Sequence, residues 1–397
     1  MNIDFQRKID AIAGTAICRI LSLFSSKQEN ISHAPKKIMV ILLSEMGSLV
    51  LARPMFDKLK SKYPEAEIFG LLFEQNRIIL ELIDAIPQKN ILTVSNQSLM
   101  KLILGSIRVL IHMNRIKVDT VIDCELFSRI SSIFSFFSGA KIRVGFHRHK
   151  LEGLYRGDFI NQPVLYNPYN HISQQFVTLA EAIESEGMPR VKRWISDKLA
   201  DQTLIQFSSE EVDNFRNKFS TDFPDALKKK LVLIYPSGGL LPIRAWPLDN
   251  YCQLAEQLIN KGYSVGVIGV DSDKQFAKKI QLHCNSQACI DLTGYTETIR
   301  ELMIIFHFAA LLITNDGGPG HFAAMTPIPS IIFYGPETPV LYGPISRNAY
   351  IFHRTLSCSP CLTAYNHRNS PCDGNNQCLQ GILVEDVMKK AQEILEV

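Results

Sequence analysis

The chain has 397 residues, which exceeds the roughly 250–300 residues at which a single hydrophobic core stops growing, so two domains are expected. Hydrophobic residues make up 46% of it and charged residues 20%, a composition that excludes wholesale disorder, a collagen-like repeat and a coiled coil. The 42 basic and 39 acidic residues leave a net charge of only +3, which argues against a chain-wide nucleic-acid-binding surface. No window reaches the ~18 uninterrupted apolar residues of a membrane span, and the N-terminal apolar stretch has no cleavage site after it, so we expect a cytoplasmic protein.

Residues 1–34 are predicted to form an amphipathic N-terminal segment. Apolar residues recur there at helical spacing, and Arg7, Lys8, Arg19 and Lys27 supply positive charge. A basic amphipathic helix can lie on an anionic membrane surface, or it can pack its apolar face on its own domain. The first alternative predicts a peripheral position at the inner face of the cytoplasmic membrane.

Residues 35–190 alternate between short apolar runs and amphipathic stretches. The run at 38–43 is continuously apolar, as expected of a strand buried on both faces. Further strands are expected at residues 66–73, 91–94, 120–124 and 142–146, with helices between them. This alternation predicts a parallel sheet in a doubly wound α/β domain.

The loop of residues 44–48 follows the first strand, at the edge of the sheet where substrates bind in such folds. From there Glu45 can act as a general base, or it can simply cap the next helix. Asp123 and Glu125 end another predicted strand and are the next candidates for the base.

The strand–helix rhythm is lost at residues 191–208, which we interpret as a linker, and it resumes in a second doubly wound domain at 209–355. Residues 356–397 form a cysteine-rich loop and a helix at 384–395, which is expected to return to the first domain. Two such domains in tandem predict a ligand in the cleft that they face, at the carboxyl ends of the strands.

A glycine-rich turn follows a predicted buried strand at residues 314–324. Its Asp316, Gly317 and Gly318 precede a short helix that carries His321 in its first turn. Helix N-termini bind phosphate through unpaired N–H groups, so the turn is either a phosphate site or an ordinary strand-to-helix connection.

A second loop of this half runs from Ser237 to Arg244, whose guanidinium can pair bidentately with phosphate or can lie on the surface beside Trp246. The two loops make this half the nucleotide-binding one. Either Asp271 or Asp273, after the strand ending at Gly269, can hold ribose hydroxyls.

Four of the nine cysteines crowd into the C-terminal tail, whereas the other five are scattered and are interpreted as small buried hydrophobic residues. The four are Cys358, Cys361, Cys372 and Cys378. Closely spaced thiolates in a cytosolic protein suit a zinc or iron–sulfur centre, but the spacing is not that of a standard zinc finger. A structural metal, a disulfide and free thiols therefore all stay open.

Several of these segments together resemble glycosyltransferase family nine, the lipopolysaccharide heptosyltransferases and their relatives. The resemblance covers about residues 37–397. It lies in the first strand, loop and helix with Pro54, in Arg-Ala-Trp-Pro at 244–247, in the turn at 314–324, in Tyr-Gly-Pro at 334–336, and in the cysteine tail.

The resemblance implies a two-Rossmann, GT-B-type enzyme that inverts the anomeric carbon without a catalytic metal. It implies a nucleotide-sugar donor such as ADP-heptose, bound by the second domain, and a lipid-linked saccharide acceptor, bound by the first. Asp316 is then expected to orient sugar hydroxyls. The family's catalytic aspartate position is Ser48, after Gly47 in the acceptor loop, so Glu45 is the expected substitute. A sugar-nucleotide epimerase of the same fold and a catalytically degenerate sugar-nucleotide-binding protein are the alternatives.

Overall fold

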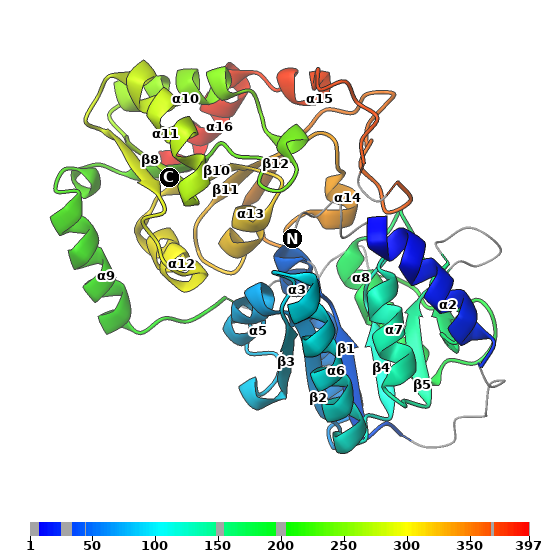
Figure 1. Cartoon of the computed structure of the whole chain (residues 1–397). Coiled ribbons are helices and arrows are strands. Elements are labelled where there is room, and N and C mark those ends of the chain that lie inside the picture. The colour runs from blue at the N-terminus through cyan, green and yellow to red at the C-terminus, as the bar shows by residue number, and fades with distance from the viewer. Residues whose placement is uncertain are drawn as a thin grey trace. The chain divides into compact units, whose positions relative to one another are not determined.

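The computed structural model describes residues 8–24, 34–43, 45–147, 155–195, 204–366 and 369–396. The chain divides into two compact units, Met1–Leu199 and Ala200–Val397. Each unit holds one six-stranded, wholly parallel sheet covered by helices, so the prediction of two doubly wound α/β domains is confirmed (Figure 1). None of the helices in the described ranges is both long enough and apolar enough to cross a bilayer.

The sheet of the first unit has the strand order β3-β2-β1-β4-β5-β6. Its strands are β1 (Lys37–Ile41), β2 (Glu67–Phe73), β3 (Ile91–Val94), β4 (Thr120–Asp123), β5 (Ile142–Phe146) and β6 (Gln162–Val164). After its first residue, Lys37, the central strand β1 is apolar and buried, because helices cover both faces of the sheet.

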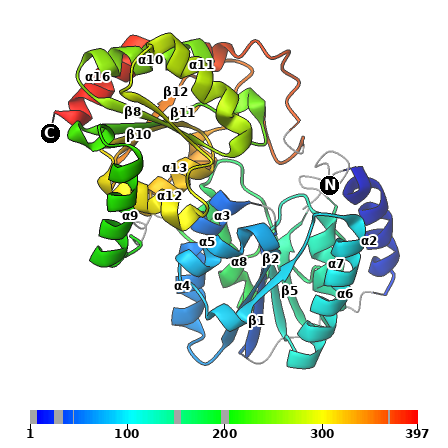
Figure 2. The ribbon, with the colours of Figure 1, turned by 60° about the vertical axis from the view of Figure 1, so that its left-hand side comes forward.

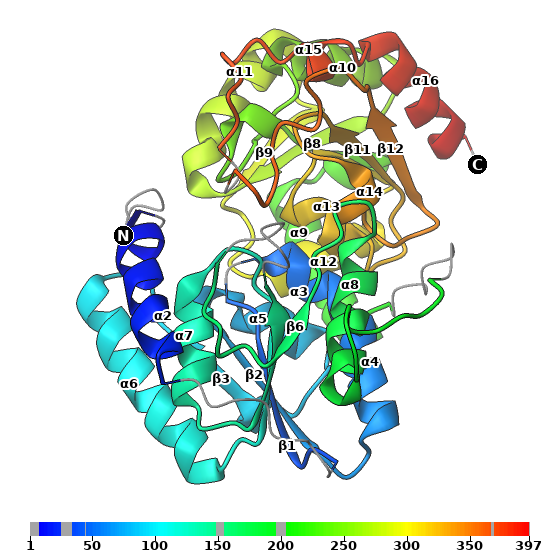
Figure 3. The same ribbon diagram turned by 90° about the vertical axis from the view of Figure 1, so that its right-hand side faces the viewer.

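Helices form two layers around this sheet. They are α2 (Thr15–Ser22), α3 (Met46–Leu51), α4 (Arg53–Lys62), α5 (Arg77–Leu82), α6 (Leu99–Ile116), α7 (Arg129–Phe137) and α8 (Ile172–Glu181). Figure 3 shows α6 and α7 on one face of the sheet and α4 and α8 on the other. The core on the α6 side is formed by Val109 and Met113 of α6 and Phe134 of α7, packed on β1, β2 and β4.

The N-terminal segment packs on its own unit, which was one of the two alternatives. A π-helical turn, η1 (Asp10–Gly14), leads into α2, and both lie against α7. Cys18 of α2 is fully buried beside Phe159 and Ile160. The opposite side of the segment stays exposed, with Ile12 and Leu23 among its accessible apolar residues.

The sheet of the second unit has the order β12-β11-β10-β7-β8-β9. Its strands are β7 (Leu231–Tyr235), β8 (Ser264–Gly269), β9 (Cys289–Thr293), β10 (Leu311–Asn315), β11 (Ser330–Tyr334) and β12 (Ala349–His353). Its helices are α9 (Ser209–Asp222), α10 (Leu248–Asn260), α11 (Lys274–Cys284), α12 (Ile299–Phe308), α13 (Gly318–Ala323), α14 (Pro339–Tyr342), α15 (Gln377–Gln380) and α16 (Val384–Leu395).

The expectation that the C-terminal helix returns to the first domain is wrong. Val387, Met388 and Ala391 of α16 are buried in the core of the second unit, together with Leu254 and Leu258 of α10. Figure 2 shows α16 beside α10, with which it is in contact. The helix has one apolar stripe, and α10 and the adjoining strands bury that stripe completely.

Candidate functional site

In the first unit, Glu45 lies between β1 and α3, at the carboxyl end of the central strand. Its backbone is extended and occupies the position before the helix, but its side chain accepts no capping hydrogen bond from the backbone N–H groups of α3, so the capping alternative is unsupported. Instead Ser48 Oγ donates a hydrogen bond of 3.0 Å to Glu45 Oε2. The structure therefore brings together the acid proposed as base and the serine at the aspartate position. Gly47 lies between them in α3, and Ser44 lies outside the described residues.

Glu125, one of the alternative bases, contacts the backbone just before this loop. It is 5% exposed, and its Oε1 accepts a hydrogen bond of 2.7 Å from the backbone N–H of Leu43, the last described residue before the loop. The Asn76 amide donates to the Leu43 carbonyl oxygen at 2.6 Å. Both polar groups of Leu43 are thus fixed by buried side chains, which sets the direction in which the chain enters the loop.

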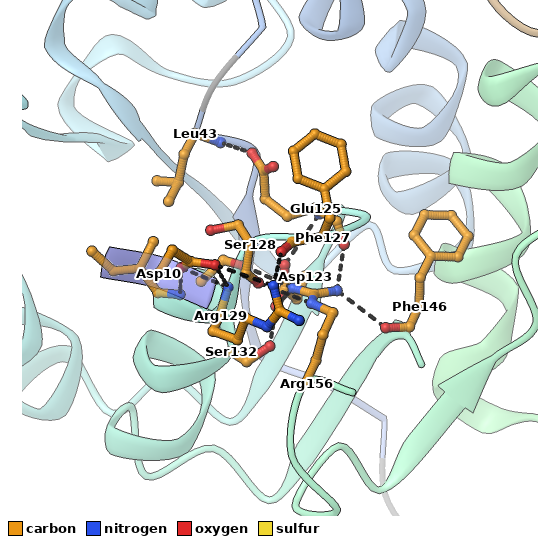
Figure 4. A network of polar contacts seen from close by, with 12 residues as sticks. Asp10, Leu43, Asp123, Glu125, Phe127, Ser128, Arg129, Ser132, Phe146 and Arg156 are labelled. Atoms are coloured by element: carbon orange, nitrogen blue, oxygen red, sulfur yellow. Dashed lines mark hydrogen bonds and ion pairs between the residues drawn. The ribbon is translucent and has the colours of Figure 1, made fainter. Parts of the chain in front are cut away.

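Asp123, the other alternative base, is unsuited to that role because it is fully buried and ion-paired with Arg156 (Figure 4). Asp123 also accepts hydrogen bonds from the backbone N–H of Glu125 at 3.1 Å and from Ser132 Oγ at 3.3 Å. The Arg156 guanidinium, itself without solvent exposure, donates to the carbonyl oxygens of Phe146 at 3.1 Å and Ser128 at 2.9 Å. A buried pair satisfied in this way fixes the ends of β4 and β5.

The N-terminal segment is tied to the same network by Asp10. Its carboxylate accepts hydrogen bonds of 2.9 Å from the backbone N–H groups of both Arg129 and Ile130, at the start of α7 (Figure 4). An acid at this position satisfies N–H groups that have no partner within the helix and opposes the positive end of its dipole. Asp10 is a cap supplied from more than a hundred residues away, which helical periodicity in the sequence could not reveal.

In the second unit, Asn315 at the end of β10 joins the two predicted donor loops. Its Oδ1 accepts hydrogen bonds from the backbone N–H of Trp246 at 2.9 Å and from the Tyr251 hydroxyl at 3.1 Å, and its Nδ2 donates to the Ser237 carbonyl oxygen at 3.1 Å. Sequence reasoning assigned this residue no separate role. Asn315 is buried, and both its amide oxygen and its amide nitrogen are hydrogen-bonded. Because it holds the backbone of Trp246, it also fixes the position of Arg244, two residues earlier.

The sequence predicted that the Arg244 guanidinium pairs with phosphate. In the structure this guanidinium already has two acidic partners. Its Nη2 donates to Glu337 Oε2 at 2.5 Å, and its Nε lies 3.4 Å from Asp316 Oδ2. The three side chains, which we call the Arg244 cluster, follow the neighbouring strands β7, β10 and β11. Glu337 was missed by sequence reasoning, although its place after Tyr-Gly-Pro at 334–336 was a usable signal.

The net charge of the Arg244 cluster depends on whether one of its two carboxyl groups, Glu337 or Asp316, is protonated. Glu337 is 2% exposed, and burial raises its pKa to about 7, opposed by the Arg244 guanidinium. Burial likewise raises the pKa of Asp316, and Arg244 again opposes the shift. Two carboxylates facing one guanidinium carry a net negative charge when both are ionised, so near neutral pH the cluster holds a proton part of the time.

The other predicted donor residues differ in their local environments. Gly317 is extended, and a Cβ there would meet no neighbour within 4 Å, so the backbone at this turn is open to a ligand. Gly318 begins α13, where His321 is buried. Ser237 accepts a hydrogen bond of 3.1 Å from the Gly239 N–H, which stabilises its own loop.

The two candidate ribose-binding acids are now distinguished. Asp271 is largely exposed and pairs with Lys274 at 2.8 Å. Asp273 is buried, and its Oδ2 accepts from the Val270 N–H at 3.1 Å, which closes its own turn. Of the two, Asp271 has the carboxylate that a ligand can reach.

The four cysteines of the tail do not form a metal centre in the described part of the chain, where no three His, Cys, Asp or Glu side chains gather closely enough to hold an ion. All four are free thiols; Cys358 and Cys372 are exposed, and Cys378 is buried. Ser370 Oγ donates to Cys361 Sγ at 3.0 Å. Among the described residues, the metal and disulfide alternatives are therefore unsupported.

Two doubly wound domains with polar loops at the carboxyl ends of their central strands define an α/β enzyme that handles a nucleotide-linked substrate. The chain belongs to glycosyltransferase family 9 (heptosyltransferase), whose family model matches residues 112–370. Membership favours the transferase over the epimerase alternative.

Individual relatives agree with this assignment. Lipopolysaccharide heptosyltransferase 2 of Salmonella typhimurium is 24% identical over 364 residues, which cover 90% of this chain and 98% of the relative. Among solved structures, Escherichia coli ADP-heptose lps heptosyltransferase II has a TM-score of 0.68 at 21% identity, covering 91% of this chain and 98% of its own. E. coli heptosyltransferase WaaC with ADP-2-deoxy-2-fluoro heptose has a TM-score of 0.61 at 14% identity, covering 90% and 99%.

Proposed function

We propose that the protein is an inverting heptosyltransferase that moves heptose from ADP-heptose to a lipid-linked saccharide of the lipopolysaccharide type. The observation that carries the proposal is the family match over residues 112–370. The names of the relatives supply the sugar, the nucleotide and the acceptor class, since they include lipopolysaccharide heptosyltransferase 2 and an ADP-heptose lps heptosyltransferase II.

The donor is assigned to the second unit. The departing ADP carries growing negative charge, and Arg244, whose Nε lies 3.4 Å from Asp316 Oδ2 beside the glycine turn, can stabilise it in place of a catalytic metal. Arg244 is paired with two acids, and the donor is favoured when the cluster holds a proton, because an additional carboxylate would repel the diphosphate. Asp316 and His321 would contact the sugar and phosphate, with Ser237 and Asp271 on the nucleoside side.

The acceptor is assigned to the first unit, with Glu45 as general base. An acceptor hydroxyl is too weak an acid to attack unaided, and a carboxylate within hydrogen-bond reach can take its proton as the new bond forms. The hydrogen bond from Ser48 holds the Glu45 carboxylate in one orientation. Ser48 is therefore a positioning residue in this scheme, and Glu45 is the catalytic one.

The competing proposal is a degenerate transferase that binds the donor without turnover, because serine replaces the family's usual aspartate. Incubation with ADP-heptose and a heptose-deficient lipopolysaccharide, followed by mass spectrometry of the glycolipid, separates the two. Addition of one heptose supports the transferase. Donor binding by calorimetry with no product on any tested acceptor would support the degenerate protein instead.

We further propose a cytoplasmic protein that works at the membrane periphery, because the donor is water-soluble and the acceptor is lipid-linked. The N-terminal segment is expected to contribute weak binding to anionic bilayers. Deleting it would also remove Asp10, the cap of α7, so exposed positions are the better target. Substituting Ile12, Ile20 and Leu23 with serine should shift part of the protein from the membrane pellet to the supernatant; an unchanged distribution contradicts this contribution.

A further inference from the structure

Helix α6 has two apolar faces, and only one of them is covered. Val109 and Met113 pack into the core of the first unit and are buried. A second set of large apolar side chains is 46–66% exposed, and we call it the outer row: Met100, Ile103, Leu104, Ile107 and Ile111. Spacings of three and four residues place the outer row on a single stripe of the helix. A contiguous exposed stripe of this kind marks an interaction site, whereas scattered exposed apolar residues do not.

A line of positive charge runs beside the outer row. It consists of Lys101, Arg108 and Arg115, each seven residues from the next, and we call it the basic row. Seven residues are about two helical turns, so the three side chains lie along one line, roughly 80° around the axis from the middle of the outer row. All three are exposed, and α6 contains no Asp or Glu along its 18 residues.

The neighbouring helices extend the same layer. α7 is in contact with both α6 and α2, and Figure 1 shows it between them. The Asn114 amide of α6 donates a hydrogen bond of 2.9 Å to the Phe137 carbonyl at the end of α7, where the Phe137 ring is exposed. α2 adds exposed Ile20 and basic Arg19. The exposed apolar surface of the first unit therefore extends beyond one helix.

We propose that the outer and basic rows of α6 form a docking surface for an anionic lipid bilayer. The outer row would enter the boundary between headgroups and acyl chains, while the basic row lies against the headgroup phosphates, as amphipathic interfacial helices do. Charge selects this occupant over a second copy of the chain, because copies meeting at α6 would bring two acid-free basic helices together. The docking surface is argued independently of the proposed function. It rests on that function only for its biological role, which is to bring the enzyme to a lipid-linked acceptor in the bilayer.

Co-sedimentation of the full-length protein with vesicles tests the surface. Phosphatidylcholine vesicles with and without phosphatidylglycerol separate the charge contribution, and added salt should weaken binding by screening it. Each basic residue near an anionic surface contributes about fivefold to binding, so replacing the basic row with glutamine should weaken it by roughly 100-fold. A variant with Ile103, Ile107 and Ile111 changed to serine should lose at least about tenfold, given the apolar area removed.

The matched control is Leu282→Ser, at a 72% exposed position on α11 of the second unit, which should bind vesicles like the wild type. Circular dichroism and ADP binding verify that every variant is folded. Binding that does not need phosphatidylglycerol, wild-type binding by both α6 variants, or no vesicle binding at all overturns the proposal.

Other outcomes would identify a different occupant, a different surface or a different activity. If sedimentation velocity shows a dimer that the serine variant of α6 dissociates, and vesicles are not bound, the occupant is a second copy. If only the variant with Ile12, Ile20 and Leu23 changed to serine loses binding, the docking surface is the N-terminal segment. If the protein binds vesicles but transfers no heptose, the proposed activity is refuted and the docking surface is still supported.

Discussion

Substitution of Glu337 by glutamine should flatten the pH dependence of the second unit's stability. Glu337 is buried, and its pKa is raised from 4.5 to about 7. The folded state therefore binds a proton that the unfolded state has already released, and stability falls as the pH rises from about 4.5 to 7. With these two pKa values, linkage gives a loss of about 2–3 kcal/mol between pH 5 and pH 8, which glutamine cannot contribute because it does not titrate.

Urea unfolding monitored by tryptophan fluorescence can measure this effect. The chain has two tryptophans; Trp246 is 1% exposed in the core of the second unit and Trp194 is fully exposed, so the emission shift reports mainly on the second unit. The wild type should lose stability from pH 5 to pH 8, and the difference between wild type and Glu337→Gln should change by about 2–3 kcal/mol over that range. Glu297→Gln, at an exposed position, is the control. If Glu337→Gln keeps the wild-type pH dependence, the proton is held elsewhere and our account of the cluster is wrong.

Three further predictions concern single side chains. Glu45→Gln should lower turnover by roughly 10²–10⁴-fold with donor affinity nearly constant, and Ser48→Ala should do much less; retained activity in Glu45→Gln would mean that the base lies elsewhere. Arg244→Ala should weaken ADP binding in calorimetry by ~1.5–3 kcal/mol, and unchanged affinity would count against a role in donor binding. Arg156→Met leaves the Asp123 carboxylate buried without its partner, so urea unfolding of the first unit should show a loss of about 3–5 kcal/mol, and a loss below about 1 kcal/mol would disprove the structural role of the pair.

Most of the fold was predictable, because the signals that define it are local. Uninterrupted apolar runs such as residues 38–43 indicate strands covered on both faces, and their alternation with helices indicates a parallel sheet. The resemblance to family nine came from motifs within short segments and was confirmed. The candidate loops at Glu45 and Asp316 were found in the same way, because each follows the carboxyl end of a central strand.

The tertiary structure decided which distant groups meet. Arg244 and Glu337 are separated by 93 residues, yet they pair because β7 and β11 both flank β10, and the sequence shows neither the pairing nor the proton that it entails. An amphipathic helix shows that one stripe will be buried but not by which partner, so α16 was assigned to the wrong unit. The periodicity of α6 predicted a helix, whereas burial alone showed that the sheet covers one of its two apolar faces and leaves the other exposed.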